Sequence, residues 1–258
     1  MDTSAHLESV VAQTTTFAEW VQGQDPATRV PTCPKWSLAE LVGHVGGTQR
    51  MVATLVGQRL TDPSAALAAM DTGPADPAGW RAWLTGTAAA AADAFGSVDD
   101  STPVWDPSGG DSGVPFWARR LFGEITVHRA DAAGALGEHY DVSPDHAAAT
   151  IDDWLETMTS PGYAQARPEF VDAIRDTGRV LHFHATDSAH EWLVRRTPDL
   201  VVLERAHAEA DATVRGPAAE LLLVLTRRRP LDAARNLDLH GDRASLDHWI
   251  EHMDWVAG

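Results

Sequence analysis

The segment WARRLFGEITVHRADA, residues 117–132, is the most informative part of the chain for its architecture. Its apolar side chains recur every three to four residues, which predicts an amphipathic helix from about residue 115 to 136. Glu124 and His128 are four residues apart and share the apolar stripe, so both should point toward neighbouring helices. Burying a carboxylate and an imidazole is costly unless they find a partner, so this helix predicts either a polar network or a bound cation.

Three further segments carry apolar residues at helical spacing, over about residues 4–23, 38–55 and 77–95. Ser37 and Glu40 have the spacing of a capping box at the start of the second segment. His44 lies near the inward stripe of that helix. Together the four segments predict a helix bundle, with residues 97–114 as a long loop that could carry function.

The second half of the chain changes character. A helix over about 143–158 and a connector, SPGYAQARP, are expected before strand-like segments that begin at Arg179. A helix over about 218–227, a strand over about 237–240 and a last helix from about Ala244 to Trp255 complete the pattern. The predicted fold class is therefore α+β, with a four-helix bundle over residues 1–160 and a smaller α+β domain over residues 161–258.

The composition restricts the partners. The chain has 258 residues and a formal net charge of −17, which argues against a nucleic-acid partner or an anionic membrane surface. One cysteine, Cys33, cannot form an internal disulfide, and the chain opens without a secretory signal pattern. The expected location is the cytoplasm.

From the residues alone, His44, Glu124 and His128 form a candidate metal site. Two nitrogens and one oxygen suit Zn²⁺, and three protein ligands leave a position for water or substrate, as in catalytic zinc sites. Two alternatives stay open at this point. His44 could be a hydrogen-bonded residue at the edge of the core, and Glu124 with His128 a simple pair on one helix.

Three segments resemble the mycothiol-dependent maleylpyruvate isomerase family. PTCPKWSLAELVGHVGGTQR, residues 31–50, resembles the family segment that carries its first zinc-binding histidine, and residues 117–132 resemble the segment with its Glu and second His. Residues 211–253 resemble its C-terminal domain, although Thr226-Arg227 stands where Trp-Gly is frequent.

The resemblance implies a DinB-like bundle followed by a sterol-carrier-like domain, with the active site between them. It implies Zn²⁺, or another divalent metal, on His44, Glu124 and His128, and mycothiol as the thiol cosubstrate. The thiolate would add to a double bond of a maleylpyruvate-like electrophile, allow rotation, and then leave. Mycothiol also implies a high-GC actinobacterial host, in agreement with Lys35 being the only lysine.

Two alternatives to this isomerase remain at the level of sequence. One is a mycothiol S-transferase acting on another electrophile, and the other is a non-catalytic ligand-binding protein in which the metal only staples the bundle. The partners expected in the enzymatic case are a small electrophile and a low-molecular-weight thiol. The expected assembly is a monomer or a small homo-oligomer.

Three arginines are candidates for stabilising negative charge during the reaction. Arg120 lies one helical turn before Glu124, where an ion pair with that carboxylate is the simpler expectation, and Arg215 and Arg228 come from the second domain. Asp131 could hold the ring of His128. The pairs His182 with His184, and His248 with His252, lack an obvious third ligand and are expected to be structural or surface residues.

Overall fold

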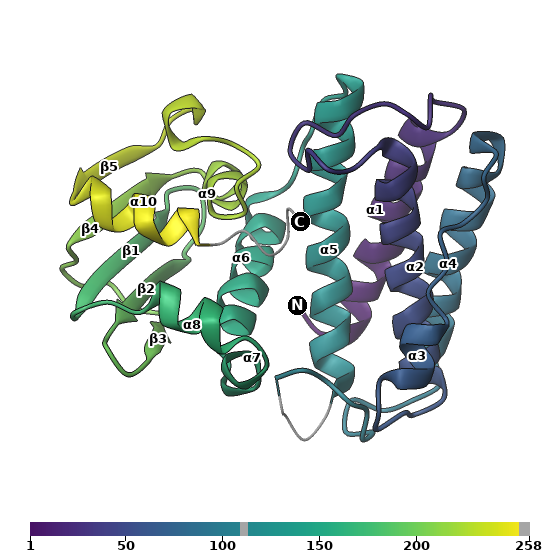
Figure 1. Ribbon diagram of the computed structural model, residues 1–258, viewed down its shortest axis with the longest axis horizontal. Helices are drawn as coiled ribbons and strands as arrows, with labels where there is room; N and C mark the ends of the chain where they lie inside the picture. Colours follow the sequence, from purple (N-terminus) through teal and green to yellow (C-terminus); the bar gives the residue numbers. More distant parts are fainter. Residues whose placement is uncertain (109–112, 253–258) are drawn as a thin grey trace. The chain divides into compact units, whose positions relative to one another are not determined.

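The computed structural model describes residues 1–108 and 113–252 and divides the chain into two compact units, Met1–Asp141 and Val142–Gly258 (Figure 1). The sequence suggested a division near residue 160. The structure places it earlier because helix α6 (Pro144–Thr159) packs against helix α9 (Ala218–Leu225) and strand β3 (Val201–Glu204). In addition, Trp192 Nε1 donates a 2.7 Å hydrogen bond to Asp152 Oδ1 on α6.

The first unit is the predicted four-helix bundle. Its long helices are α1 (Thr3–Val21), α2 (Leu38–Gly57), α4 (Trp80–Gly96) and α5 (Gly113–Leu136). Helices α1 and α2 each pack against both α4 and α5. The connection between α2 and α4 holds two short elements that the sequence did not predict, α3 (Ser64–Ala68) and the 3₁₀ helix η1 (Pro77–Gly79).

Buried polar side chains tie the four long helices together. Gln13 on α1 donates to Thr126 Oγ1 on α5 at 3.0 Å. Gln49 on α2 donates to Thr14 Oγ1 on α1 at 2.7 Å and accepts from Thr87 Oγ1 on α4 at 2.7 Å. Since each bond is directional, this network fixes the register of the helices more closely than apolar packing alone.

The glycines beside His44 allow close packing on α2. A Cβ atom at Gly46 would lie 2.2 Å from the ring of Trp83, closer than any real contact. Only glycine fits without displacing that indole. The VGHVGG segment therefore combines the polar side chain of His44 with a tightly packed helix surface.

The second unit is α+β, as predicted, with a five-stranded sheet in the order β3-β2-β1-β4-β5. Strands β1 (Arg179–Ala185) and β4 (Ala212–Gly216) pair in parallel, and the other pairs are antiparallel. The remaining strands are β2 (Glu191–Arg196) and β5 (Asp238–Gly241). Helices α9 and α10 (Arg243–Glu251) pack against β1 and β4, and the 3₁₀ helix η2 spans Leu231–Ala233.

Two sequence expectations for this unit differ from the structure. The predicted connector contains helix α7 (Pro161–Ala166), followed by α8 (Pro168–Ile174). Ser160 caps α7 by accepting from Tyr163 N at 3.2 Å, with a proline at the first helical position, the same signal that starts α6 at Ser143. Helix α10 is present to Glu251, while the predicted end at Trp255, and residues 109–112 of the predicted loop, lie outside the described residues.

Arg227 follows α9 with a backbone φ of +61°, in the left-handed region that favours glycine. The arginine keeps the turn but adopts a conformation that is less favourable for a residue with a Cβ atom.

Candidate metal centre

The bundle brings His44, Glu124 and His128 together. The Oε2 atom of Glu124 lies 3.3 Å from Nε2 of His44 and 3.1 Å from Nε2 of His128. One ligand atom from each of the three residues lies within 4.8 Å of the other two. An ion about 2 Å from each ligand in a tetrahedral site would separate them by about 3.3 Å. The donor set and its spacing therefore fit a small divalent metal such as Zn²⁺.

Local sequence signals determine where the three candidate ligands lie on their helices. Ser37 and Glu40 form the predicted capping box, in which Ser37 N donates to Glu40 Oε2 at 2.6 Å. This fixes the start of α2, and hence the phase that turns His44 toward α5. On α5, Glu124 and His128 lie one turn apart on the same face.

Arg120 neutralises Glu124 from one turn before it. The guanidinium donates to Glu124 Oε1 through Nη2 at 2.5 Å and through Nε at 3.1 Å. Burial opposes ionisation of Glu124, but the Arg120 charge and the hydrogen bonds from His128 and His44 hold the pKa of this carboxyl well below its ordinary value. The ion pair expected for Arg120 is present, and Glu124 is a carboxylate at neutral pH.

Asp131 holds the ring of His128 from the other side. Because a carboxylate only accepts, Nδ1 of His128 donates to Asp131 Oδ2, at 2.8 Å. Nε2 of a neutral ring would then present a lone pair to the Glu124 carboxylate. Two acceptors at 3.1 Å repel unless a proton or a metal cation lies between them. The hydrogen bond from His128 Nδ1 to Asp131 is the usual way in which a carboxylate orients a metal-binding histidine.

Without a metal, a proton satisfies this arrangement. Burial disfavours a charged ring, but Asp131 and Glu124 outweigh burial and raise the pKa of His128. The same two carboxylates that stabilise an imidazolium would stabilise a cation bound to the ring. The site is thus electrostatically prepared for positive charge.

Residues of the loop before α2 complete the surroundings of the three candidate ligands. Most of their contacts were not predicted from the sequence. Thr32 Oγ1 donates to Asp131 Oδ1 at 2.5 Å, and the buried thiol of Cys33 lies 3.6 Å from Asp131 Oδ2. The indole of Trp36 lies 4.9 Å from the His44 ring and 5.7 Å from the His128 ring. Cys33 therefore helps to hold the Asp131 side chain in place, and Trp36 covers one side of the two imidazoles.

Exposure differs sharply among the three candidate ligands. The side chain of His128 is 1% exposed, that of Glu124 16% and that of His44 32%. Solvent reaches the cluster from the His44 side, so an additional ligand would enter there.

The other two candidate arginines belong to the second unit. Arg228 is buried and donates to the carbonyl of Thr226 at 2.9 Å. Arg215 is exposed on β4, opposite His184 of β1. Burial lowers the pKa of His184, against the influence of Glu191, and the Arg215 charge lowers it further.

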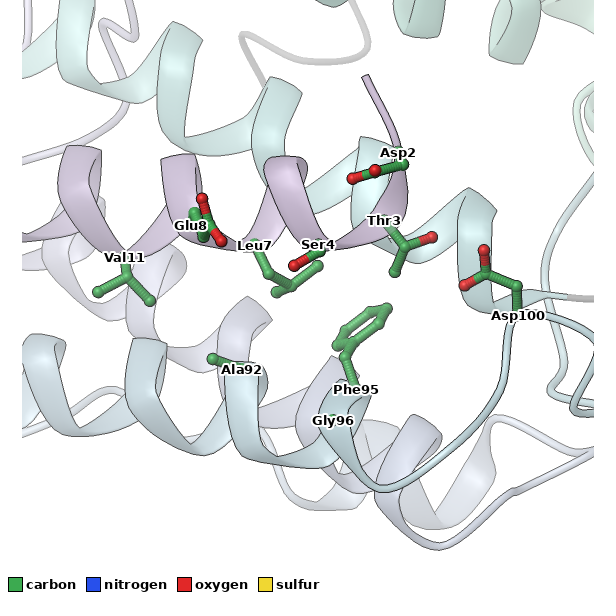
Figure 2. A pocket seen from close by; sticks show the side chains of 10 residues that line it. All are labelled: Asp2, Thr3, Ser4, Leu7, Glu8, Val11, Ala92, Phe95, Gly96 and Asp100. Carbon is green, nitrogen blue, oxygen red and sulfur yellow. The ribbon is translucent and has the colours of Figure 1, made fainter.

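An open cavity of about 690 Å³ on the bundle lies away from this chemistry. Figure 2 shows Leu7 and Phe95 facing the space between α1 and α4, with the carboxylates of Asp2 and Asp100 toward one end. Its lining includes none of the three candidate ligands and no cationic side chain: Asp2, Thr3, Ser4, Leu7, Glu8, Val11, Ala92, Phe95, Gly96 and Asp100. This cavity is therefore separate from the candidate metal centre.

The two other histidine pairs behave differently from each other. His248 Nδ1 lies 2.6 Å from Nη2 of the buried Arg196, and His252 Nδ1 lies 2.7 Å from the His248 carbonyl, so this pair serves local packing. His182 and His184, in contrast, are joined by Glu191 and His207. Sequence reasoning missed these two partners.

Within the described residues, no helix has both the length and the apolar character needed to cross a membrane.

The fold and this cluster define a two-unit protein with a helix bundle that carries a candidate metal centre. The model of the mycothiol maleylpyruvate isomerase N-terminal domain matches residues 7–133, and that of the MDMPI C-terminal domain matches residues 145–248. These matches span most of the chain, which therefore belongs to the mycothiol-dependent maleylpyruvate isomerase family.

Solved structures agree on the fold. The crystal structure of a mycothiol-dependent maleylpyruvate isomerase is 13% identical, with 93% of each chain covered and a TM-score of 0.58. A histidine-to-alanine mutant of a mycothiol-dependent maleylpyruvate isomerase is 14% identical, with 91% of this chain and 92% of that chain covered and a TM-score of 0.58. No curated protein matches the chain in sequence.

Proposed function

We propose that this protein is a metal-dependent enzyme that uses mycothiol to isomerise a maleylpyruvate-like substrate from cis to trans. The observation that carries the proposal is the convergence of His44, Glu124 and His128 in a bundle of this family, with Asp131 orienting His128. Catalytic zinc sites commonly combine two histidines and one carboxylate with one open position.

His44, Glu124 and His128 would hold the metal, which we propose to be Zn²⁺. When bound, the ion lowers the pKa of a coordinated thiol and so supplies a thiolate near neutral pH. Asp131 keeps the Nε2 lone pair of His128 directed at the site, and Arg120 keeps Glu124 ionised and in place. Trp36 limits the access of water to the imidazoles from one side.

A maleylpyruvate-like substrate is a dianion, whereas the chain carries a net charge of −17. Local cations are therefore needed to bind it. Arg120 is already paired with Glu124, so we propose as candidates for holding substrate carboxylates Arg215, which is exposed, or Arg228, which would have to give up its hydrogen bond to the Thr226 carbonyl. Replacing such a residue should raise KM more than it lowers kcat.

The test is turnover of maleylpyruvate by the purified full chain with Zn²⁺, with and without mycothiol. Activity that requires both, with mycothiol recovered unchanged, supports the proposal. Stoichiometric consumption of mycothiol into a stable adduct would instead identify an S-transferase. Zinc binding without any thiol-dependent chemistry would leave a metal-stapled binding protein, and the enzymatic proposal would be wrong.

A matched pair of variants separates the site from the fold. His44→Ala removes the most exposed candidate ligand, while His139→Ala removes an exposed histidine outside the cluster. We expect the first variant to lose metal and activity without unfolding, because the apolar stripe of α2 remains. The second should behave like the original chain.

A further inference from the structure

A second cluster of histidines lies on the sheet of the second unit. His182 and His184 alternate along β1 and therefore share one face. Glu191, the first residue of β2, pairs directly with His184 and lies on that same face. His207 reaches the group from the segment between β3 and β4. Strands β1 and β2 lie side by side in the middle of the sheet (Figure 1).

Three imidazoles converge on one carboxylate oxygen. Glu191 Oε2 lies 2.8 Å from Nε2 of His182, 2.7 Å from Nδ1 of His207 and 3.5 Å from Nδ1 of His184. One ligand atom from each of the four residues lies within 4.8 Å of the others.

One of these groups is incompletely satisfied. Nδ1 of His184 is shielded from solvent and makes no hydrogen bond to any part of the chain that the structure describes. The Glu191 oxygen lies 3.5 Å away, within ion-pair distance but too far for a good hydrogen bond, so this shielded nitrogen is incompletely satisfied and can take a further ligand. A metal ion at the centre of the cluster would satisfy this nitrogen together with the other donors.

We propose that His182, His184, Glu191 and His207 form a second metal site, for a divalent transition-metal ion of the Zn²⁺ class. Three imidazoles and a carboxylate suit Zn²⁺, and four protein ligands are typical of structural zinc sites, in contrast to the three available in the bundle. An adjacent cavity of about 550 Å³, lined by the three histidines together with Thr213 and Arg215, provides an entry path.

The site would fasten a loop to the sheet. The His207 side chain is 74% exposed and lies on residues 205–211, which have no regular secondary structure, whereas His182 is buried in β1. Coordination by both residues would tie this segment to the β1–β2 hairpin. A metal here would therefore stabilise the second unit locally.

The first experiment counts zinc. The full chain is dialysed to equilibrium against Zn²⁺, and bound metal is measured for the original chain, for His207→Ala and for the control His240→Ala. His240 lies on β5, pairs with Thr213 and is exposed, but it is outside the cluster. We expect His207→Ala to bind one equivalent less than the other two chains, or to bind that equivalent at least about tenfold more weakly. Equal zinc binding by all three chains would overturn the proposal.

The second experiment follows the loop. Trypsin cleaves after Arg205, two residues before His207, and mass spectrometry quantifies the new ends. We expect Zn²⁺ to slow this cleavage in the original chain and in His240→Ala but not in His207→Ala. Zinc protection that persists in His207→Ala would contradict the proposed ligand set. Neither readout depends on catalysis, so failure of the proposed function would leave this test intact.

Discussion

The two histidine clusters are built on different scaffolds. In the bundle, Glu124 and His128 lie one turn apart on α5 and meet His44 from α2, so all three groups stand on long helices. In the sheet, His182, His184 and Glu191 stand on a hairpin, but His207 stands on an irregular segment. The first cluster is therefore held in place before any ligand binds, whereas the second depends on a segment that must be ordered.

Their charges differ as well. The bundle cluster includes two carboxylates, from Glu124 and the supporting Asp131, together with the Arg120 guanidinium. The sheet cluster has the single carboxylate of Glu191 among its four groups. A preformed site with an orienting carboxylate and only three candidate ligands suits chemistry, while a site with four ligands, one of them from a loop, suits stabilisation.

Removing a ligand that stands on the long helices should have the greatest consequence. His128→Ala should lower the metal affinity of the bundle site by at least about a hundredfold and abolish thiol-dependent turnover. The zinc equivalent proposed for the sheet should remain. Metal analysis and the turnover assay check this, with His139→Ala as control. Unchanged zinc content and turnover in His128→Ala would remove the basis for the metal centre.

Asp131→Asn tests the support of the ligand instead of the ligand itself. The amide cannot orient and polarise His128 as the carboxylate does, so we expect metal affinity to fall by about ten- to a hundredfold. Asp93→Asn, at an exposed position on α4, is the matched control. Zinc titration in competition with a chelator measures both. An affinity equal to that of the control would mean that Asp131 is only a packing residue.

The two clusters should release bound metal in a definite order. His128 is 1% exposed, whereas His207 is 74% exposed. A chelator added to the zinc-loaded chain should therefore remove the sheet equivalent first and the bundle equivalent later, in two kinetic phases. His207→Ala should lack the fast phase. A single phase with unchanged amplitude in that variant would contradict the difference drawn between the sites.

The metal-free protein should become less stable as the pH rises. Although burial opposes protonation, Asp131 and Glu124 raise the pKa of His128 above the ordinary 6.5. The protonated ring therefore stabilises the fold below that ordinary value, and this stabilisation is lost as pH rises through the raised pKa. The Tm of the metal-free chain should fall over this range, and less so in His128→Ala. An equal slope in both chains would show that His128 does not carry the effect.

The ionisation of Glu124 changes stability with pH in the opposite direction. Its pKa is held well below the ordinary 4.5, so its contribution to stability is present above that value and is lost only as pH falls through the lowered pKa. The two titrations therefore affect stability in separate ranges of pH.

The smallest effect is expected at the helix start. Ser37→Ala removes the capping box of α2 and should cost about 1 kcal/mol of unfolding free energy. For a chain of this size, that corresponds to a Tm lower by roughly 2–4 °C. Thermal unfolding measures the shift. A large loss of metal affinity from this change alone would show that the scaffold is less rigid than described.

The sequence predicted the first cluster better than the second for a physical reason. Helical periodicity places Glu124 and His128 on one face, so local spacing already indicates the contact. The partner role of Asp131 follows from the same helix. The contacts of Thr32 and Trp36 could not be predicted in this way, because the irregular loop that carries them has no helical or strand periodicity.

The sheet cluster depends on strand pairing. The alternation of His182 and His184 is visible in the sequence, but the contact with Glu191 requires the hairpin register, and His207 lies further along in an irregular segment. The short connection between β1 and β2 was the available signal for Glu191. The contacts of α6 with α9, which place α6 in the second compact unit, are likewise not local in sequence.

The metal centre of the bundle can be tested by the zinc anomalous signal in crystals of the full chain grown with Zn²⁺. The structure predicts a peak bounded by His44 Nε2, Glu124 Oε2 and His128 Nε2, with Asp131 still hydrogen-bonded to His128 Nδ1. Well-ordered crystals without a peak at these three atoms, while the Arg120–Glu124 ion pair is intact, would contradict the proposed metal centre.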